Sequence, residues 1–212
     1  SSDFAIEVNS LKKKELAERS RDATVAAIAP VMRMKLIEPH GTTNDKKVQS
    51  AERSMTWGVK AVGADTSPFT GDGIVAGVLD TGIDATHPAF SGVELIQKDC
   101  TGEGNGDEHG HGTHCAGTIF GRSVNGMRIG VAPGVKKALI GKVLGKTGGG
   151  SSDQICDAIQ WAIDNGANVI SMSLGMDFPG YMADLRASGV PEEVAVSSAL
   201  EGYRKNVLLF EK

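Results

Sequence analysis

Two nearly continuous hydrophobic runs stand out in the pattern of apolar and polar positions along the chain. They cover Ile74–Leu79 and Ala138–Leu144. Short runs with few polar residues are typical of strands that are buried on both faces of a sheet. We therefore expect both segments to be interior strands of one sheet.

A helix and a further strand are expected after the second run. Ser151 to Gln154 matches the capping-box pattern that marks the beginning of a helix. The apolar positions that follow recur at helical spacing, and they are Ile155, Ile159, Ala162 and Ile163. Asn165-Gly166 is typical of a helix end, and a strand is expected over Val169–Leu174. Strands joined through a helix pair in parallel, so the pattern predicts an α/β fold with a parallel sheet and helices on both faces.

The last helix is expected from Pro191 towards Lys212. Proline is common at the beginning of a helix, and the acidic residues Glu192 and Glu193 are favourable in its first turn. We expect one face of this helix to be buried, because it carries apolar residues at helical spacing. These residues are Val196, Leu200, Tyr203 and Val207.

The first 53 residues show a different pattern, that of a small α+β unit. Its expected elements are a half-buried strand, a helix with a polar cap, and extended strands interrupted by a proline. In chain order they are residues 4–8, Leu11–Asp22 with Asn9 or Ser10 as the cap, and residues 25–36 with Pro30. We therefore divide the chain into an N-terminal segment, 1–53, and a main region, 54–212.

Composition and charge narrow the classes of function. Hydrophobic residues make up 40% and charged residues 23% of the chain, which are ordinary values for a globular protein. The net charge is -4 and the chain has no basic face, so we expect no nucleic-acid partner. No apolar stretch approaches the roughly 18 residues that cross a bilayer, so no membrane partner is expected, and no signal peptide is visible.

Candidate catalytic chemistry lies at the end of the first hydrophobic run and further along the chain. Asp80 directly follows that run, and His111 begins a segment rich in small residues, Gly-Thr-His-Cys-Ala-Gly. A buried carboxylate can hold a histidine in one tautomer and stabilise its protonated form, so that the histidine acts as a general base. We predict these two roles for Asp80 and His111.

Two other kinds of site contain similar motifs. The Asp-Thr-Gly sequence at 80–82 is also the signature of aspartic proteases, which need two such carboxylates, whereas it occurs once here. His109, His111 and His114 have a spacing found in zinc hydrolases, but no further ligands accompany them, and we predict no metal site. Cys115 follows His111 by one helical turn, so that a Cys–His pair is conceivable, but we expect a packed and inert thiol.

These motifs resemble those of the subtilisin-like serine proteases. The Asp and His segments are similar to the first two catalytic motifs of that family, and His-Gly-Thr-His-Cys-Ala-Gly-Thr resembles its proteinase K-like branch. Ser171-Met172-Ser173-Leu174-Gly175 resembles the family's substrate-binding strand. The segments around Trp57 and Gly71 resemble its approach to the Asp motif. The resemblance covers about residues 55–212.

The resemblance implies a serine endopeptidase that hydrolyses peptide bonds through an Asp-His-Ser triad. Asp80 and His111 would be the acid and the base, and the nucleophilic serine would lie outside this chain, which should therefore be inactive alone. Ser173, Leu174 and Gly175 would bind an extended peptide through their backbone groups. A catalytically inactive, peptide-binding relative is the alternative that stays open.

The resemblance also implies an organisation and partners. Residues 1–53 would be a propeptide-like segment of a zymogen or an N-terminal extension. Residues 54–212 would be the N-terminal portion of the catalytic domain, with its C-terminal remainder as a partner and polypeptides as substrates. We expect secretion and no required cofactor. A structural calcium ion is compatible with the acidic segment Asp99–Glu108, in which we assign no ligands.

Overall fold

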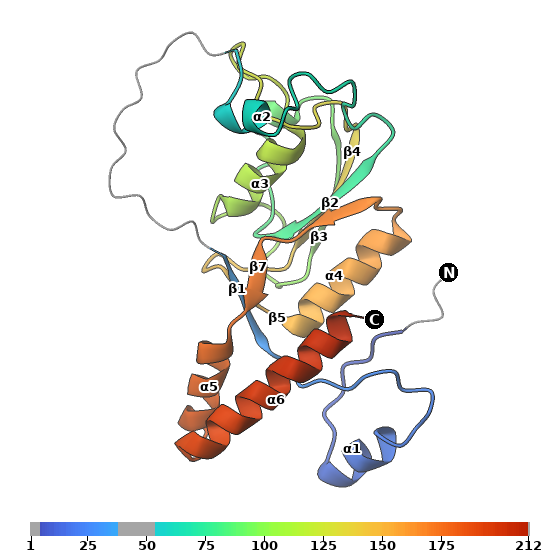
Figure 1. Ribbon diagram of the computed structural model, residues 1–212, viewed down its shortest axis with the longest axis vertical. Coiled ribbons are helices and arrows are strands. Elements are labelled where there is room, and N and C mark those ends of the chain that lie inside the picture. The colour runs from blue at the N-terminus through green and yellow to red at the C-terminus, as the bar shows by residue number, and fades with distance from the viewer. Residues whose placement is uncertain (1–4, 38–53, 212) are drawn as a thin grey trace.

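A four-stranded parallel sheet forms the centre of the main region (Figure 1). The computed structural model describes residues 5–37 and 54–211. The sheet has the order β3-β4-β2-β6, and all neighbouring strands in it are parallel. In that order its strands are Glu94–Asp99, Lys137–Lys142, Val75–Asp80 and Val169–Ser171. The two hydrophobic runs thus form the two central strands, as predicted.

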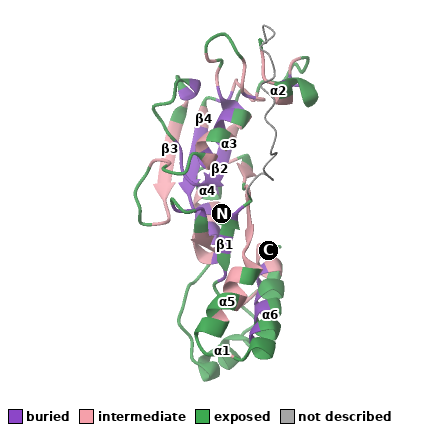
Figure 2. Ribbon diagram, turned by 90° about the vertical axis from the view of Figure 1, so that its left-hand side faces the viewer, coloured by how far each residue is buried: buried purple, intermediate pink, exposed green. Residues whose placement is uncertain are grey.

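Helices cover both faces of this sheet. Successive side chains of a strand point to opposite faces, so one strand can pack against helices on both. Ala76 of β2 packs with the helix α3 (His111–Phe120), whereas Leu79 of β2 packs with α4 (Ser152–Asp164). The buried strands form the purple interior in Figure 2. Leu79 is fully buried, and burial of a side chain of this size stabilises a fold by about 1.5–3 kcal/mol. The predicted α/β class is confirmed.

The helix α4 begins and ends where its sequence predicts. Ser151 is its N-cap, and the side chain of Gln154 accepts a hydrogen bond of 3.1 Å from the Ser151 N–H. Asn165 is its C-cap, and Gly166 follows with a φ of 83°, in the left-handed region that favours glycine. The capping box and the closing glycine therefore bound this helix.

A second sheet of three short strands has part of the N-terminal segment as its middle strand. Its order is β5 (Gly149–Ser151), β1 (Arg33–Leu36) and β7 (Leu174–Met176), and β1 is antiparallel to both neighbours. Exposed and buried side chains alternate along β1, with Met34 and Leu36 packed into the cluster around α4. The N-terminal segment is thereby attached to the main region.

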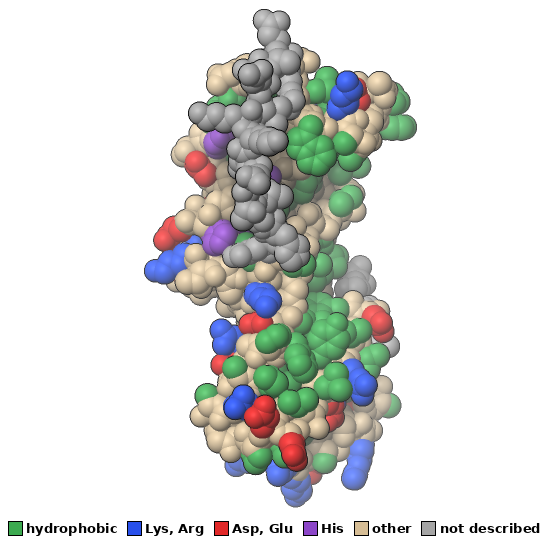
Figure 3. Space-filling model, turned by 60° about the vertical axis from the view of Figure 1, so that its left-hand side comes forward, with side chains coloured by type: hydrophobic (Ala, Val, Ile, Leu, Met, Phe, Trp, Pro, Cys, Tyr) green, Lys and Arg blue, Asp and Glu red, His purple; other side chains and the backbone are tan. Residues whose placement is uncertain are grey.

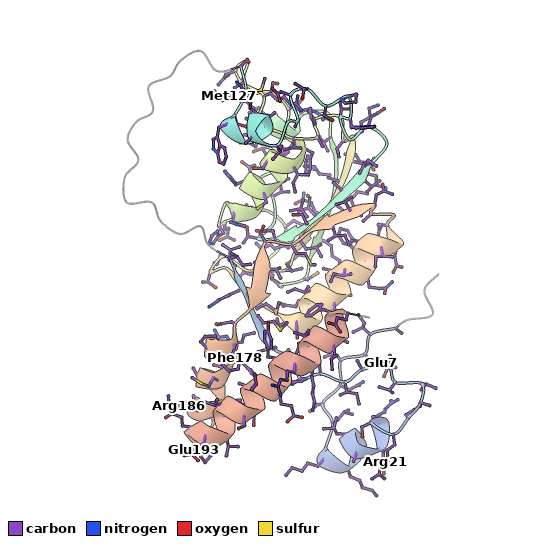
Figure 4. All side chains as sticks on the ribbon, viewed as in Figure 1. Glu7, Arg21, Met127, Phe178, Arg186 and Glu193 are labelled. Atoms are coloured by element: carbon purple, nitrogen blue, oxygen red, sulfur yellow. The ribbon has the colours of Figure 1, made fainter. Side chains whose placement is uncertain are left out.

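Other helices surround these two sheets. They are α1 (Lys13–Arg19), α2 (Trp57–Ala61), the short 3-10 helix η1 (Pro88–Phe90), α5 (Phe178–Ala187) and α6 (Glu192–Phe210). Figure 4 labels Phe178 and Arg186 on α5 and Glu193 at the beginning of α6, which packs against α5. Among the described helices, none is long and apolar enough to cross a membrane.

The N-terminal segment is less regular than predicted. Residue 4 lies outside the described residues, and residues 5–8 are exposed and form no strand, since no described strand pairs with them. Of residues 25–36, only β1 is a strand, because only this part lies between β5 and β7. The strand predicted after Pro30 is thus present as β1, whereas the strand predicted before Pro30 is wrong.

The helix of this segment is shorter than expected. We predicted Leu11–Asp22, whereas α1 has only the bounds given above and none of its residues is buried. The predicted caps Asn9 and Ser10 are wrong, because Lys12 is the N-cap and its N–H donates a 2.7 Å hydrogen bond to Glu15. Without an apolar face to bury, only this local bonding supports the helix.

The strand predicted over Val169–Leu174 is in fact two strands in different sheets. β6 ends at Ser171, and Leu174 begins β7 beside β1. The chain leaves the parallel sheet between these residues because its continuation forms hydrogen bonds with β1 instead. The strand β3 and the helix α5 were not predicted.

The predicted buried face of the last helix is also wrong, although the helix begins after Pro191 as expected. Val196, Leu200 and Tyr203 are 41%, 42% and 39% exposed. The buried face is one residue away and consists of Ala195, Ala199, Gly202 and Asn206. Small side chains let α6 approach closely, since a Cβ at Gly202 would lie 3.2 Å from both Pro30 and Tyr181.

Candidate active site

Asp80 and His111 meet where β2 ends and α3 begins. Asp80 is the last residue of β2 and His111 is the first of α3. Their side chains are 2% and 16% exposed, and His111 Nδ1 lies 2.8 Å from Asp80 Oδ1. Because an ionised carboxylate only accepts hydrogen bonds, Nδ1 carries the hydrogen and Nε2 is left to take up a proton.

Two glycines allow the histidine to approach the carboxylate. Gly110 is the N-cap of α3 and has a φ of 92°, in the left-handed region. A Cβ at Gly112 would overlap the carbonyl oxygen of Gly82 and lie 3.2 Å from Asp80 Cβ. The beginning of α3 can therefore lie directly on the turn that follows β2 only if this position has no side chain.

Residues 173–175, which are predicted to bind an extended peptide, lie beside the extended strand β1. Ser173 precedes β7, and its carbonyl oxygen accepts a 3.2 Å hydrogen bond from the N–H of Ile37. Leu174 and Gly175 lie opposite the last two residues of β1 in an antiparallel register. The other edge of β1 pairs with β5 at Arg33, Met34 and Lys35, so that β1 is the middle strand between β5 and β7. We call the space between β5 and β7, which β1 occupies, the groove.

Comparison with known proteins identifies the family of this chain. The sequence model of the subtilase family matches residues 71–207, which is more than half of the chain. The chain belongs to the subtilase family.

Several curated relatives of this subtilase chain are named proteases. The alkaline protease of Alkalihalobacillus alcalophilus is 38% identical over 141 residues, which are 64% of this chain and 36% of the relative. Subtilisin Savinase of Lederbergia lenta is 39% identical over 133 residues, 60% of this chain and 48% of the relative. A subtilisin-like protease of Coccidioides posadasii is 31% identical over 200 residues, 87% of this chain and 52% of the relative. The chain thus spans about one third to one half of the length of these relatives.

Sequence reasoning missed Asp107, the residue that joins the two halves of this subtilase site. Its Oδ1 accepts hydrogen bonds from Thr81 Oγ1 at 2.8 Å, from the Gly110 N–H at 2.8 Å and from the His109 N–H at 3.1 Å. Its Oδ2 accepts from the N–H and the hydroxyl of Thr113, at 2.9 and 2.6 Å. Asp107 therefore ties the turn after Asp80 to the first turn of α3.

The charge of Asp107 suits this position. Although partial burial raises the pKa of its carboxyl, the hydrogen bonds from Thr113, Gly110 and Thr81 outweigh burial and hold the pKa below its ordinary value. An ionised carboxylate at the beginning of a helix also interacts favourably with the helix dipole. A signal was present in the sequence, since an aspartate shortly before a predicted helix is a candidate cap.

Cys115 contacts the histidine of the site, as its position one turn along α3 allows. Its Sγ lies 3.6 Å from His111 Nδ1 and 3.9 Å from the Ser173 hydroxyl. Burial, and next the charge of Asp80, raise the pKa of the Cys115 thiol. The neutral thiol favoured by this environment fits the prediction of a packed, inert cysteine. The contact between Cys115 and Ser173 also places Ser173 beside the Asp80–His111 pair.

The three histidines considered for zinc do not converge. Among the described residues, the one group of three potential ligands whose atoms lie within 4.8 Å of one another is Asp80, His111 and Cys115. His109 and His114 are outside it, and His114 is exposed. The carboxylate of Asp80 faces a histidine rather than a second aspartate, unlike the paired carboxylates of an aspartic protease.

The acidic segment considered for calcium uses its oxygens in hydrogen bonds within its own loop and to neighbouring segments. Asp99 accepts hydrogen bonds from the N–H and hydroxyl of Thr101 and from the N–H of Gly104. Glu103 accepts a 2.9 Å bond from the Lys146 N–H. These carboxylates organise turns, and we assign no calcium ligands among them.

Proposed function

We propose that this chain is part of a serine endopeptidase, with Asp80 as the orienting acid and His111 as the general base. The observation that carries the proposal is the 2.8 Å contact between His111 Nδ1 and Asp80 Oδ1 at the end of a buried strand. Membership of the subtilase family and the names of the relatives support it.

The chemistry follows from this contact. The Nδ1–H of His111 donates to Asp80, so Nε2 removes the proton from a serine hydroxyl as that oxygen attacks the peptide carbonyl. Asp80 stabilises the imidazolium that forms, and Nε2 then returns the proton to the leaving amine. In our proposal the serine lies outside residues 1–212, in the remainder of the catalytic domain.

Polypeptides are the proposed substrates, and the groove between β5 and β7 is the proposed binding site. An extended peptide would lie antiparallel to both strands, as β1 does, and accept and donate backbone hydrogen bonds at Ser173, Leu174 and Gly175. Backbone bonding of this kind is independent of side chains, so any sequence preference must come from side chains at the edge of the groove.

The position of β1 supports a zymogen. We propose that residues 1–53 are a propeptide-like segment and that β1 keeps substrates out of the groove, because its hydrogen bonds use both walls. Residues 54–212 would then form the first part of the catalytic domain. Secretion is proposed on the family resemblance alone.

The experiment is to label the natural protein with a serine-directed phosphonate and locate the modified residue by mass spectrometry. We expect one modified serine outside residues 1–212. We also expect peptide hydrolysis to fall by at least about a thousandfold in Asp80→Asn and in His111→Gln. Labelling of Ser173, or full activity of either variant, would contradict the assignment.

The same samples test the open alternative, a catalytically inactive peptide-binding protein. That alternative requires peptide binding without hydrolysis and without phosphonate labelling. Gly175→Phe separates binding from catalysis, because a Cβ at Gly175 would already lie 3.8 Å from Ile37 in the groove. A larger side chain there should weaken peptide binding in either case, whereas Asp80→Asn should weaken only hydrolysis.

A further inference from the structure

The outward-facing side chains of β1 are both basic, and both meet an aspartate at the rim of the groove. The inward-facing residues Met34 and Leu36 are 4% and 7% exposed. Arg33 and Lys35 alternate with them along the strand and point the other way, with side chains that are 55% exposed. The chain that fills the groove thus alternates basic and apolar residues.

Lys35 meets Asp177, the residue that follows β7. Lys35 Nζ lies 3.1 Å from Asp177 Oδ1, and the Asp177 side chain is only 17% exposed. The backbone N–H of Asp177 also donates a 2.8 Å hydrogen bond to the carbonyl oxygen of Arg33. Asp177 therefore contacts the bound strand through both its backbone and its charge. Figure 4 labels Phe178, the next residue, at the beginning of α5.

Arg33 meets a second carboxylate, on α5. Its Nη1 lies 3.0 and 3.1 Å from the two oxygens of Asp184, whose side chain is 53% exposed. On the face shown in Figure 3, acidic and basic side chains are mixed with hydrophobic ones over the lower half of the molecule. Both carboxylates belong to the segment that follows β7, since Asp177 is the N-cap of α5 and Asp184 lies within that helix.

We propose that Asp177 and Asp184 form an acidic rim that selects basic residues at alternate positions of an extended peptide bound between β5 and β7. The groove between the two strands accepts apolar side chains at the intervening positions, as it accepts Met34 and Leu36. The ligand class is thus a peptide with the alternation basic, apolar, basic, apolar. This inference rests on the proposed function only where it concerns substrates, because β1 itself already has this alternation and both ion pairs.

The two carboxylates contribute unequally. Ion pairs between exposed side chains contribute about 0.2–1 kcal/mol, which is about a 1.4- to 5-fold change in an equilibrium constant. Asp184 is half exposed and belongs at the lower end of that range. Asp177 is more buried and belongs at the upper end. Although burial raises the pKa of Asp177, its bonds from Lys35 and the Gly180 N–H hold the pKa below the ordinary value.

The test is a double-mutant cycle read by hydrogen exchange in the natural protein. Its variants are Lys35→Gln, Asp177→Asn and the pair of both. Asn retains an oxygen for the 3.2 Å bond from the Gly180 N–H that caps α5, so the variant removes mainly the charge. The probes are the amides of Leu36 and Ile37, which donate to the carbonyl oxygens of Gly148 and Ser173.

We expect each single variant to lower the protection of both amides by up to about fivefold, and the double variant to lower it no further. A smaller, about twofold loss is expected for Arg33→Gln and for Asp184→Asn. Lys136→Gln is the matched control, because it breaks the exposed 2.8 Å pair with Asp72 away from the groove. Additive losses, or an equal loss in the control, would overturn the acidic rim.

A second arm uses substrates. Two peptides are compared that differ only in lysine or norleucine at the position equivalent to Lys35. The active protein should prefer the lysine peptide by about two- to fivefold in kcat/KM, and Asp177→Asn should remove the preference. Equal cleavage of both peptides by the wild type would overturn the rim as a substrate selector. If the wild type cleaves neither peptide, the proposed function fails, while the exchange cycle still decides whether the rim recognises basic residues.

Discussion

Replacement of Asp107 by asparagine tests how the two halves of the site are held together. The two side chains have the same shape, but the carboxylate accepts five hydrogen bonds, and three of its donors are backbone N–H groups. An amide nitrogen cannot accept a hydrogen bond. The NH2 group of the asparagine must therefore lie against N–H or O–H groups that are themselves donors. The conflict arises in either orientation of the amide.

The magnitude follows from the less costly orientation. With the amide oxygen at the place of Oδ1, the bonds from Thr81, His109 and Gly110 are kept. The N–H and the hydroxyl of Thr113 lose their acceptor, and of the two only the hydroxyl can turn to accept from the amide instead. A buried donor without a partner costs about 1–3 kcal/mol. Loss of a negative charge at the beginning of α3 costs about 0.3–1 kcal/mol more. We expect Asp107→Asn to lower the free energy of unfolding by about 1–4 kcal/mol.

The assay is urea unfolding of the natural protein, followed by intrinsic fluorescence. Asp99→Asn is the matched control, because Asp99 accepts three hydrogen bonds at the end of β3, beside the exposed residues 102–104, where water can replace the acceptor. The control should lose no more than about 1 kcal/mol. Equal losses in the two variants, or a loss below about 0.5 kcal/mol in Asp107→Asn, would refute the reasoning.

The same variant makes a prediction about pH. The pKa of Asp107 is lower in the folded protein than the ordinary value of about 3.9. Its contribution to stability is therefore fully present above about pH 4 and is lost as the pH falls through the folded pKa. The difference in unfolding free energy between wild type and Asp107→Asn should shrink below pH 4. A difference that stays constant down to pH 2 would show that the charge plays no part.

Three further predictions concern the core and the cysteines. Gly112→Ala should abolish the Asp80–His111 contact and lower the unfolding free energy by more than about 3 kcal/mol, since its Cβ overlaps Gly82. Gly117→Ala in the same helix is the control, because nothing lies within 4 Å of its Cβ, and its stability should be unchanged or higher. Leu79→Ala, at a fully buried position, should cost about 2–5 kcal/mol in urea unfolding. Burial raises the pKa of the Cys100 thiol to about 11, so its alkylation by iodoacetamide at pH 8 should be roughly a hundredfold slower than that of an exposed cysteine; alkylation at an ordinary rate would contradict that pKa.

The parts of the fold that depend on local patterns could be predicted from the sequence. The central strands β2 and β4 are nearly continuous hydrophobic runs, and α4 carries its own capping box and closing residues. Asp80 and His111 could be paired because each lies in a motif of its own, at the end of a strand and at the beginning of a helix. Each of these signals is contained within about ten neighbouring residues.

The parts that depend on distant contacts could not be predicted. The alternation around residues 25–36 predicted strands, but only the presence of β5 and β7 decides which four residues pair. The role of Asp107 depends on Thr81, and that contact crosses from one loop to another. The face of α6 was misjudged because large apolar residues were assumed to be buried, whereas close approach to Pro30 requires small ones.

The middle position of β1 has a consequence for the order in which the protein is assembled during translation. β1 leaves the ribosome well over one hundred residues before either of the strands that flank it. Contacts between such distant parts of a chain form slowly, because a long loop must close first. The small sheet therefore closes late, after β7 has been made. A nascent chain that ends before Leu174 leaves β1 with a single neighbour, and only the arrival of β7 completes its hydrogen bonds.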